Sequence, residues 1–404
     1  REQGGWLPRW GYANFETNIM TGDPVTPFLV DLWRFGALKG REAEAYAALR
    51  ENAFGIPAHG IRPQGRSGNP SYLKQGFVQY DRSFISKGMD TDPHHGASAT
   101  LEYAAADGAL AGMAQALGHL DDAKVLAQRA LNWKTLWDPS VVDAETGQKG
   151  FPRPRLLDGS WFGDVGSGYD PRGDHGFHEG TAWQYQWLVP QDVPGLAAAM
   201  GGVGPALGRL DQFFDYPAVL ADPNAVRKSW VVGPYSYYAQ FRYNPNNEPD
   251  LHAPWMYTLM GQPWKTATIL RGAETLFTNG PGGVTGNDDL GTMSSWYLFS
   301  ALGIYPDMPG SGRFLLHAPR FAKAEIDLPQ GRILRIEAPG AKPGERRFVK
   351  SVNYGGRAVE RVWLDWEQLQ SAGTLKYQLT TQPDTKGWGT RARDLPRPPA
   401  GVAN

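Results

Sequence analysis

Two adjacent carboxylates, Asp288 and Asp289, follow a glycine-rich run in the segment Gly-Asn-Asp-Asp-Leu-Gly at 286–291. Burying an unpaired carboxylate costs several kcal/mol, so we expect the pair to face water, a cation or a substrate. The apolar segment 293–302 comes next and predicts a buried helix. Catalytic acids and bases commonly lie where a loop meets such a rigid element. The pair is therefore the first candidate for chemistry.

A second candidate acid is Glu179, which stands between His178 and Gly180 at the start of an aromatic segment that includes Trp183. Apolar surroundings would raise the pKa of this carboxyl and keep it protonated, as a general acid requires. The alternative is a carboxylate that only stabilises the N-terminus of a helix. The residue pattern alone leaves both interpretations open.

An asparagine-rich turn supplies the third group, because Asn247, Glu248 and His252 lie close together between prolines. Amide, carboxylate and carbonyl oxygens of this kind suit a hard cation such as Ca²⁺, although the spacing is not that of an EF-hand. A polar turn without a metal is an equal alternative. A further candidate, Asp23 in Gly-Asp-Pro, is expected to serve as the turn and cap before a helix at 26–38.

Composition narrows the classes of partner. The 404 residues carry a formal net charge of −1, which gives no electrostatic footprint for nucleic acid or an anionic membrane. The chain has no cysteine, which excludes disulfides and thiolate metal sites. Its 15 tryptophans suit either sugar recognition or a large aromatic core. No nucleotide-binding or His-Glu-x-x-His motif is present, and the start at Arg1 leads us to expect a fragment or a processed product.

Paired helices separated by long Gly- and Pro-rich loops should position these groups. Small and aliphatic residues recur at helical spacing. The alanine-rich segment 97–118 has alanine on nearly all faces, which suits a helix packed on both sides. Two-sided packing is typical of a helical barrel. The long loops, at 59–94 and 150–180, are expected to be functional. The predicted helices span 26–38, 41–52, 97–118 and 121–137.

Short alternating runs replace the helical pattern after Gly310 and predict a β module. We expect a mainly α fold in which residues 1–310 form the catalytic domain, 311–390 the C-terminal β module and 391–404 a proline-rich tail. The predicted strands are Phe314–Leu316, Ala324–Leu328, Ile333–Glu337, Phe348–Val352, Val359–Leu364 and Leu375–Leu379.

The acidic-pair segment continues as Met-Ser-Ser-Trp-Tyr and then Phe-Ser-Ala-Leu-Gly-Ile-Tyr-Pro-Asp-Met-Pro-Gly, and in this form it resembles glycoside hydrolase family 92. The resemblance covers nearly the whole chain and is highly specific. Its supporting motifs are Glu2-Gln-Gly-Gly-Trp-Leu-Pro-x-Trp10, Met20-x-Gly-Asp-Pro24, Thr100-Leu-Glu-Tyr-Ala104, His178-Glu-Gly-x-Ala-Trp-Gln-Tyr185, Asn247-Glu-Pro249 and Trp388-Gly389.

The resemblance implies a calcium-dependent, inverting exo-α-mannosidase with an (α/α)6 barrel. It also implies an N-terminal β-sandwich domain that this chain lacks, which we expect as a separate or cleaved chain. A mannose-containing glycan is the implied substrate, and a secreted, periplasmic or cell-surface location in a bacterium is expected. Neither nucleic acid nor a membrane is an expected partner.

The same resemblance implies a role for each candidate residue. Glu179 matches the general acid, and Asp289 is preferred as the general base with Asp288 supporting it. Asn247 and Glu248 match the calcium-binding turn. The implied substrate contacts are Asp23, His252, Trp183 and His178.

One departure from the family pattern affects specificity. Members that cleave α-1,2 linkages carry a His-Glu pair before the Asn-x-Pro turn, whereas this chain has neither residue between Arg227 and Asn246. The linkage could be α-1,3, α-1,4, α-1,6 or a mannosyl-phosphate cap, with α-1,2 still the commonest family activity. Another (α/α)6 glycosidase and a catalytically silent mannose-binding module are the alternatives to this function.

Overall fold

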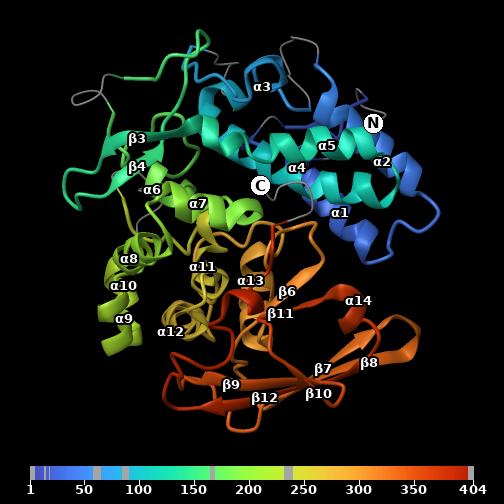
Figure 1. Cartoon of the computed structure of the whole chain (residues 1–404), viewed down its shortest axis with the longest axis vertical. Coiled ribbons are helices and arrows are strands. Elements are labelled where there is room, and N and C mark those ends of the chain that lie inside the picture. The colour runs from blue at the N-terminus through green and yellow to red at the C-terminus, as the bar shows by residue number, and fades with distance from the viewer. Residues whose placement is uncertain are drawn as a thin grey trace.

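The computed structural model describes residues 5–12, 15–17, 19–57, 65–83, 91–163, 169–231 and 240–398. Helices form the larger part of the molecule, and the C-terminal strands gather at its opposite end (Figure 1). The mainly helical class with a C-terminal sheet region agrees with the prediction from the sequence. In the described part of the chain, no helix is both long and apolar enough to cross a membrane.

Helix α4, Gly96–Ala116, is the central element of the N-terminal part. It is buried along almost its whole length and packs against α5, Leu120–Arg129, on one side and α1, Val25–Arg34, on another. Alanine and glycine allow this close approach on several faces, as the alanine-rich pattern predicts. Helices α2 (Glu42–Phe54) and α3 (Asn69–Gln75) lie beside it.

The predicted helix boundaries hold at some ends and fail at others. Helix α2 runs two residues beyond the predicted end at 52, to Phe54, and Gly55 is its C-cap. Helix α1 begins at Val25, one residue before the predicted start at 26, and ends at Arg34, before the predicted end at 38. The segment predicted as one helix over 121–137 divides into α5 and a 3₁₀ helix, Asn132–Leu136, before strand β3 (Trp137–Val142) pairs with β4 (Lys149–Pro152).

Short helices follow this hairpin and lead to the candidate site. Long loops separate them, and one loop enters α13, Thr292–Leu302. Helix α13 was predicted to be buried, but it is buried only in part: Met293, Trp296, Ser300 and Ala301 are buried, whereas Leu298 is 56% exposed. The other helices of this part are α6 (Ala182–Tyr185), α7 (Val193–Ala199), α8 (Val203–Phe214), α9 (Tyr216–Ala221), α10 (Val226–Ser229), α11 (Met256–Leu259) and α12 (Pro263–Ala273).

The C-terminal strands form two sheets. A three-stranded sheet has the order β11-β6-β5, and a five-stranded sheet has the order β10-β9-β12-β8-β7 with one parallel pair, β12 and β8. The single strand expected at 359–364 is wrong: the chain turns there and supplies one strand to each sheet. The strands are β5 (Ile304–Pro306), β6 (Arg313–Leu316), β7 (Lys323–Leu328), β8 (Arg332–Glu337), β9 (Phe348–Tyr354), β10 (Arg357–Val359), β11 (Trp363–Asp365) and β12 (Gly373–Thr380).

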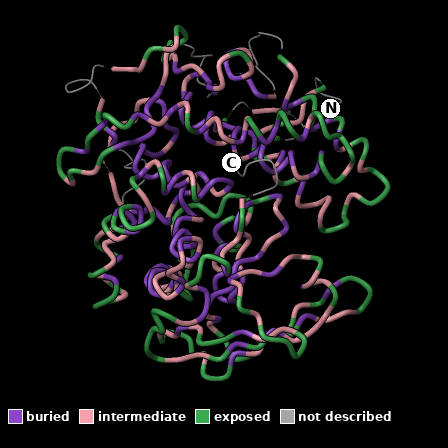
Figure 2. Tube along the Cα trace, in the orientation of Figure 1, coloured by how far each residue is buried: buried purple, intermediate pink, exposed green. Residues whose placement is uncertain are grey.

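One large hydrophobic core joins the middle helices to the sheets, and buried segments concentrate where these elements meet (Figure 2). Five tryptophans, Trp133, Trp183, Trp187, Trp230 and Trp255, are among its largest fully buried side chains. For these five residues, the tryptophan-rich composition therefore reflects core packing, the less specific of the two interpretations that the sequence allowed.

Candidate active site

Asn247 and Glu179 meet although 68 residues separate them in the chain. The Asn247 side-chain amide donates to the backbone carbonyl of Glu179 at 3.2 Å and to carboxylate atom Oε2 at 3.1 Å. Asn247 is buried, whereas the Glu179 side chain is 26% exposed. The amide thus fixes the orientation of an acid that still reaches the surface.

Local structure explains why Glu179 projects from its turn. Its φ angle is 47°, in the left-handed region that non-glycine residues seldom adopt. Thr181, two residues later, is the N-cap of helix α6 and forms a capping box with Gln184. The same two side chains also bind the backbone of the next segment, because Thr181 Oγ1 donates to the Gln240 carbonyl and Gln184 Nε2 to the Arg242 carbonyl. Helix α6 therefore holds both the acid and the asparagine-rich turn.

The loop that carries Asp289 is fixed against this turn by Gly286. Gly286 has a φ of 68°, and a Cβ atom there would lie 2.1 Å from the carbonyl oxygen of Asn246. Thr285 Oγ1 also donates to the Asn246 side-chain oxygen. Only glycine permits this close backbone approach, which places the start of the acidic loop on the turn that bears Glu248.

Glu248 brings the two halves of the site together. Burial first, and then the neighbouring carboxylates of Asp289 and Glu179, raise the pKa of its carboxyl to about 7. Both Glu248 carboxylate oxygens are buried without a hydrogen-bond donor. A buried acid facing another acid is costly unless a proton or a cation lies between them. The acidic and amide groups of this turn therefore suit a bound proton or cation.

Asp288 and Asp289 point to different partners. Asp288 accepts hydrogen bonds from the backbone N–H of Ser294 at 2.8 Å and from its hydroxyl at 3.0 Å, so it caps the first turn of α13. Asp289, with a φ of 39°, is exposed and interacts with Glu248. The geometry supports our preference for Asp289 as the base, and that role stays a prediction.

Backbone strain gathers at the same place. Non-glycine residues with positive φ include Met20 at 68°, Glu179 at 47°, Asp289 at 39° and Leu290 at 57°. Such conformations cost roughly 1–3 kcal/mol each and persist where the surrounding structure enforces them, often at functional sites. Met20 belongs to this group because its sulfur lies 3.2 Å from Nε2 of His178, the residue before Glu179.

The four predicted substrate contacts fall in different environments. His178 lies beside the acid, with Nε2 4.0 Å from Glu179 Oε1, and its Nδ1 is 3.0 Å from His95 Nε2. His252 donates from Nε2 to the Trp187 carbonyl at 2.6 Å. Their roles toward a sugar stay predictions.

Trp183 and Asp23 make contacts within the protein. Trp183 has no exposed surface, and its indole N–H donates to Asp143 at 2.9 Å, so the structure does not bring it to the acid pair. Asp23 accepts from Arg66 at 2.7 Å and from the Thr26 hydroxyl at 2.7 Å. This is the turn-and-cap arrangement that the sequence offered as the alternative for Asp23, with an added buried ion pair.

The donor chemistry of the turn fits a hard cation. Among the described residues, no group of three or more histidine, cysteine, aspartate or glutamate side chains has the arrangement of a metal site. Calcium, however, also takes amide and backbone carbonyl oxygens. The two buried, unpartnered oxygens of Glu248, next to Asn247 and Asp289, are the observation that favours a cation here.

Glu102 is an acid near the site that the sequence analysis did not assign. It is the one charged residue in the first half of the otherwise small and apolar helix α4, and it is partly exposed. Charged residues are seldom placed on a helix that packs on all sides unless they have a function or a partner. That contrast within the segment 97–118 is the signal that would have singled it out.

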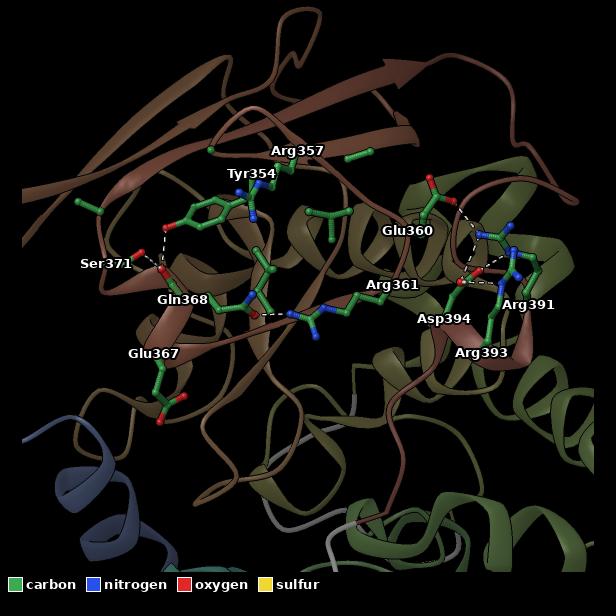
Figure 3. Close-up of a pocket in the computed structure, with 15 residues that line it drawn as sticks. Tyr354, Arg357, Glu360, Arg361, Glu367, Gln368, Ser371, Arg391, Arg393 and Asp394 are labelled. Carbon is green, nitrogen blue, oxygen red and sulfur yellow. Dashed lines mark hydrogen bonds and ion pairs between the residues drawn. The ribbon is translucent and has the colours of Figure 1, made fainter.

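A separate pocket of about 950 Å³ lies in the C-terminal β module (Figure 3). Four arginines line it, but acids in the same pocket bind several of their charges: Arg391 pairs with Glu360 at 2.7 Å and with Asp394 at 2.6 Å. Arg361 donates to Gln368 and lies over the Trp363 ring at 3.9 Å. The pocket contains none of the candidate site residues.

Three known proteins are similar to the chain over nearly its whole length. The inverting mannosidase BT2199 from Bacteroides thetaiotaomicron is 29% identical with a TM-score of 0.78 and is matched over 50% of its own chain. The α-mannosidase BT3965 from the same organism is 27% identical with a TM-score of 0.77, matched over 46%. An uncharacterized secreted glycosidase from Arthroderma benhamiae is 26% identical, matched over 49%.

All three comparisons cover 97% of this chain, which therefore spans about half the length of these relatives. A model of the glycosyl hydrolase family 92 catalytic domain matches residues 1–381. All the motifs that suggested this family from the sequence lie within that range except Trp388-Gly389, which follows it. This chain belongs to glycosyl hydrolase family 92.

Proposed function

We propose that the chain is the catalytic part of a calcium-dependent, inverting exo-α-mannosidase that releases terminal mannose from mannose-rich glycans. The observation that carries the proposal is the joining of three segments: Asn247 binds Glu179, and the next residue, Glu248, lies beside Asp289. The proposed acid and the proposed base thus both lie next to the asparagine-rich turn that is proposed to bind calcium. The inverting mannosidase and the α-mannosidase among the relatives support the same substrate class.

Inversion assigns a proton transfer to each acid. Glu179 gives its proton to the glycosidic oxygen as the bond from that oxygen to the anomeric carbon breaks. Asp289 takes a proton from a water molecule whose oxygen bonds to the anomeric carbon from the opposite face. Proton exchange with solvent then restores both groups. An inverting pair of carboxyl groups is expected to be about 6.5–9.5 Å apart, so that water fits between base and sugar.

Asn247 and Glu248 would hold the calcium ion. When bound, the ion would neutralise the facing carboxylates and offer a ligand position to the sugar hydroxyls O2 and O3. The residues of the chain have separate tasks. The Asn247 amide orients the acid, and the contact between Gly286 and Asn246 positions the base loop.

The remaining features of the proposal extend beyond the described contacts. We propose that the paired helices belong to an (α/α)6 barrel and that the protein acts outside the cytoplasm, as the secreted relative suggests. The N-terminal β-sandwich domain of the family is the proposed partner, on the same chain or a separate one. The linkage is left to experiment because the His-Glu pair of α-1,2 enzymes is missing between Arg227 and Asn246.

A panel of linkage-defined mannobioses, with and without chelator, tests the activity. The expected result is mannose release that stops in excess chelator and returns with Ca²⁺, with β-mannose as the first anomer detected by NMR. Initial release of α-mannose would refute inversion, and full activity in chelator would refute the metal. Binding of mannosides without any hydrolysis would instead favour the silent binding module.

A further inference from the structure

Glu102 makes no hydrogen bond or ion pair with the described part of the chain, although it lies deep in the protein on helix α4. Its neighbours on the same helix, Leu101 and Tyr103, are 1% and 0% exposed. Glu102 itself keeps partial exposure. A carboxyl group that reaches solvent and has no partner among the described residues is available to bind a group from outside the protein.

The backbone of the Met20–Asp23 segment lies against this carboxyl group. A Cβ atom at Gly22 would lie 1.6 Å from Glu102 Oε2, so only glycine leaves room for the acid. Gly22 also adopts a φ of 82°, which glycine tolerates best. Two independent features of Gly22, its conformation and its missing side chain, therefore serve to accommodate Glu102.

The same segment reaches the candidate active site. Met20 contacts His178, next to the proposed acid Glu179. Tyr185 is a second link, because its buried phenol donates to the His178 carbonyl at 3.0 Å. Burial raises the pKa of that phenol, and the charges that raise it further come from Glu102, Glu179 and Glu248. Glu102 thus lies in the group of acids around Tyr185.

Nearby cations are already committed to other acids. Arg9 pairs with Asp92 at 2.9 Å, and Arg66 pairs with Asp23 and Asp107, each at 2.7 Å. Burial raises the pKa of Glu102 well above its usual value, and the Asp92 charge adds to the effect more than Arg9 offsets it. In its protonated form the group is a carboxylic acid that can both donate and accept a hydrogen bond.

We propose that Glu102 binds a hydroxyl group of the terminal sugar and so helps to select which sugar the site accepts. The inference rests on the proposed glycosidase function and deepens it. A carboxyl with one donor and one acceptor matches a sugar hydroxyl, which also offers both. Glu102 lies on helix α4, whereas the residues proposed to hold calcium lie on the asparagine-rich turn.

The test compares the protein with its Glu102→Leu variant on aryl α-mannosides that each lack one hydroxyl. In the unchanged protein, removal of the hydroxyl that Glu102 binds should lower kcat/KM by about 10–100-fold, the worth of a hydrogen bond to a buried polar group. The quantity compared is the ratio of kcat/KM for the complete mannoside to kcat/KM for the mannoside that lacks one hydroxyl. In Glu102→Leu this ratio should fall close to unity for the hydroxyl that Glu102 binds, and it should stay unchanged for the other hydroxyls. Glu102→Gln, which keeps a donor and an acceptor, should retain part of the discrimination.

Two controls separate specificity from folding. Gln115→Leu places the same side chain on an exposed position of the same helix and should change no ratio. Glu102→Leu should melt at the same or a higher temperature, because it removes a largely buried polar group that has no partner in the described part of the chain. The inference would be overturned if Glu102→Leu lowered kcat/KM equally for every substrate, or if it left all the kcat/KM ratios between complete and deoxy mannosides unchanged. Inactivity of the unchanged protein on all glycosides would instead refute the proposed function.

Discussion

The side-chain amide of Asn247 donates to both the backbone carbonyl and the carboxylate of Glu179, at 3.2 Å and 3.1 Å. The turn proposed to bind calcium therefore also orients the proposed acid. Because Glu248 follows Asn247 directly and interacts with Asp289, a change in this turn is expected to reach both catalytic groups.

Replacing Asn247 with leucine should impair proton donation by Glu179. The variant removes both hydrogen bonds and keeps the side-chain volume similar, so the acid loses its fixed orientation. We expect kcat/KM to fall about 100-fold for a mannobiose and much less for an aryl mannoside whose leaving group needs little protonation. Steady-state kinetics on the two substrates checks this. An equal fall for both substrates would show that Asn247 acts through the calcium that it is also proposed to hold, and not through the acid.

The two neighbouring aspartates should respond differently to substitution. Asp289→Asn removes the proposed base and is expected to lower kcat at least about 100-fold with little change in melting temperature. Asp288→Asn mainly alters the cap of α13, so we expect a loss of stability of about 1 kcal/mol or less and a much smaller effect on kcat. Kinetics and thermal unfolding of both variants decide between them. A reversed pattern would make Asp288 the base.

Glu248→Gln should weaken calcium binding without destabilising the metal-free protein. The amide keeps the shape but removes the repulsion with Asp289. At a calcium concentration 100 times its Kd, the unchanged protein should gain about 2.7 kcal/mol. The gain should be clearly smaller in Glu248→Gln. Asp327→Asn, on exposed strand β7, removes the same charge elsewhere and should retain the full calcium-induced rise in melting temperature.

Buried His317 should make the protein acid-sensitive. Burial lowers the pKa of this histidine to about 4, from 6.5. Its Nδ1 accepts from the Trp255 indole N–H at 3.3 Å and its Nε2 donates to the Ser300 carbonyl at 3.0 Å, an arrangement that requires the neutral ring. The unfolded chain binds the proton first, so the stability from the neutral ring is complete above pH 6.5 and is lost as the pH falls to about 4.

The change amounts to about 3 kcal/mol, since each pKa unit is worth about 1.4 kcal/mol. Denaturant unfolding of the protein and of His317→Gln at pH 7 and pH 4 measures it. The unchanged protein should lose about 3 kcal/mol more than the variant across this range. Parallel losses in the two proteins would show that His317 is not the group responsible.

The acidic loop depends on Gly286 for its position. In Gly286→Ala, the new methyl group would collide with the Asn246 carbonyl, 2.1 Å away. We expect the loop to shift, activity to fall at least about 10-fold and stability to drop by about 1 kcal/mol or more. Gly291→Ala is the matched control: it imposes similar backbone strain at a φ of 91° but meets no atom within 4 Å. If both variants lose activity equally, strain alone explains the effect.

Much of the fold follows from local pattern. The alanine-rich segment became the central helix α4, and most of the predicted strands appear close to their expected bounds. Local pattern failed where a chain reversal had no strong turn signal, as at 359–364, and where one helix face stayed exposed, as in α13. Periodicity reports the faces of an element, but tertiary contacts decide where it ends and what covers it.

The sequence by itself determined the chemical groups and, through their motifs, the family: acids at 179 and 288–289, and an amide-rich turn at 247–248. It could not say which aspartate faces the turn, because adjacent side chains diverge according to backbone angles that the fold imposes. Only the tertiary structure decided that Asp288 caps α13 while Asp289 meets Glu248, and that Glu102 shares the acidic region around Tyr185. Long-range packing, such as the backbone contact of Gly286 with Asn246, sets these distances, and no local pattern encodes them.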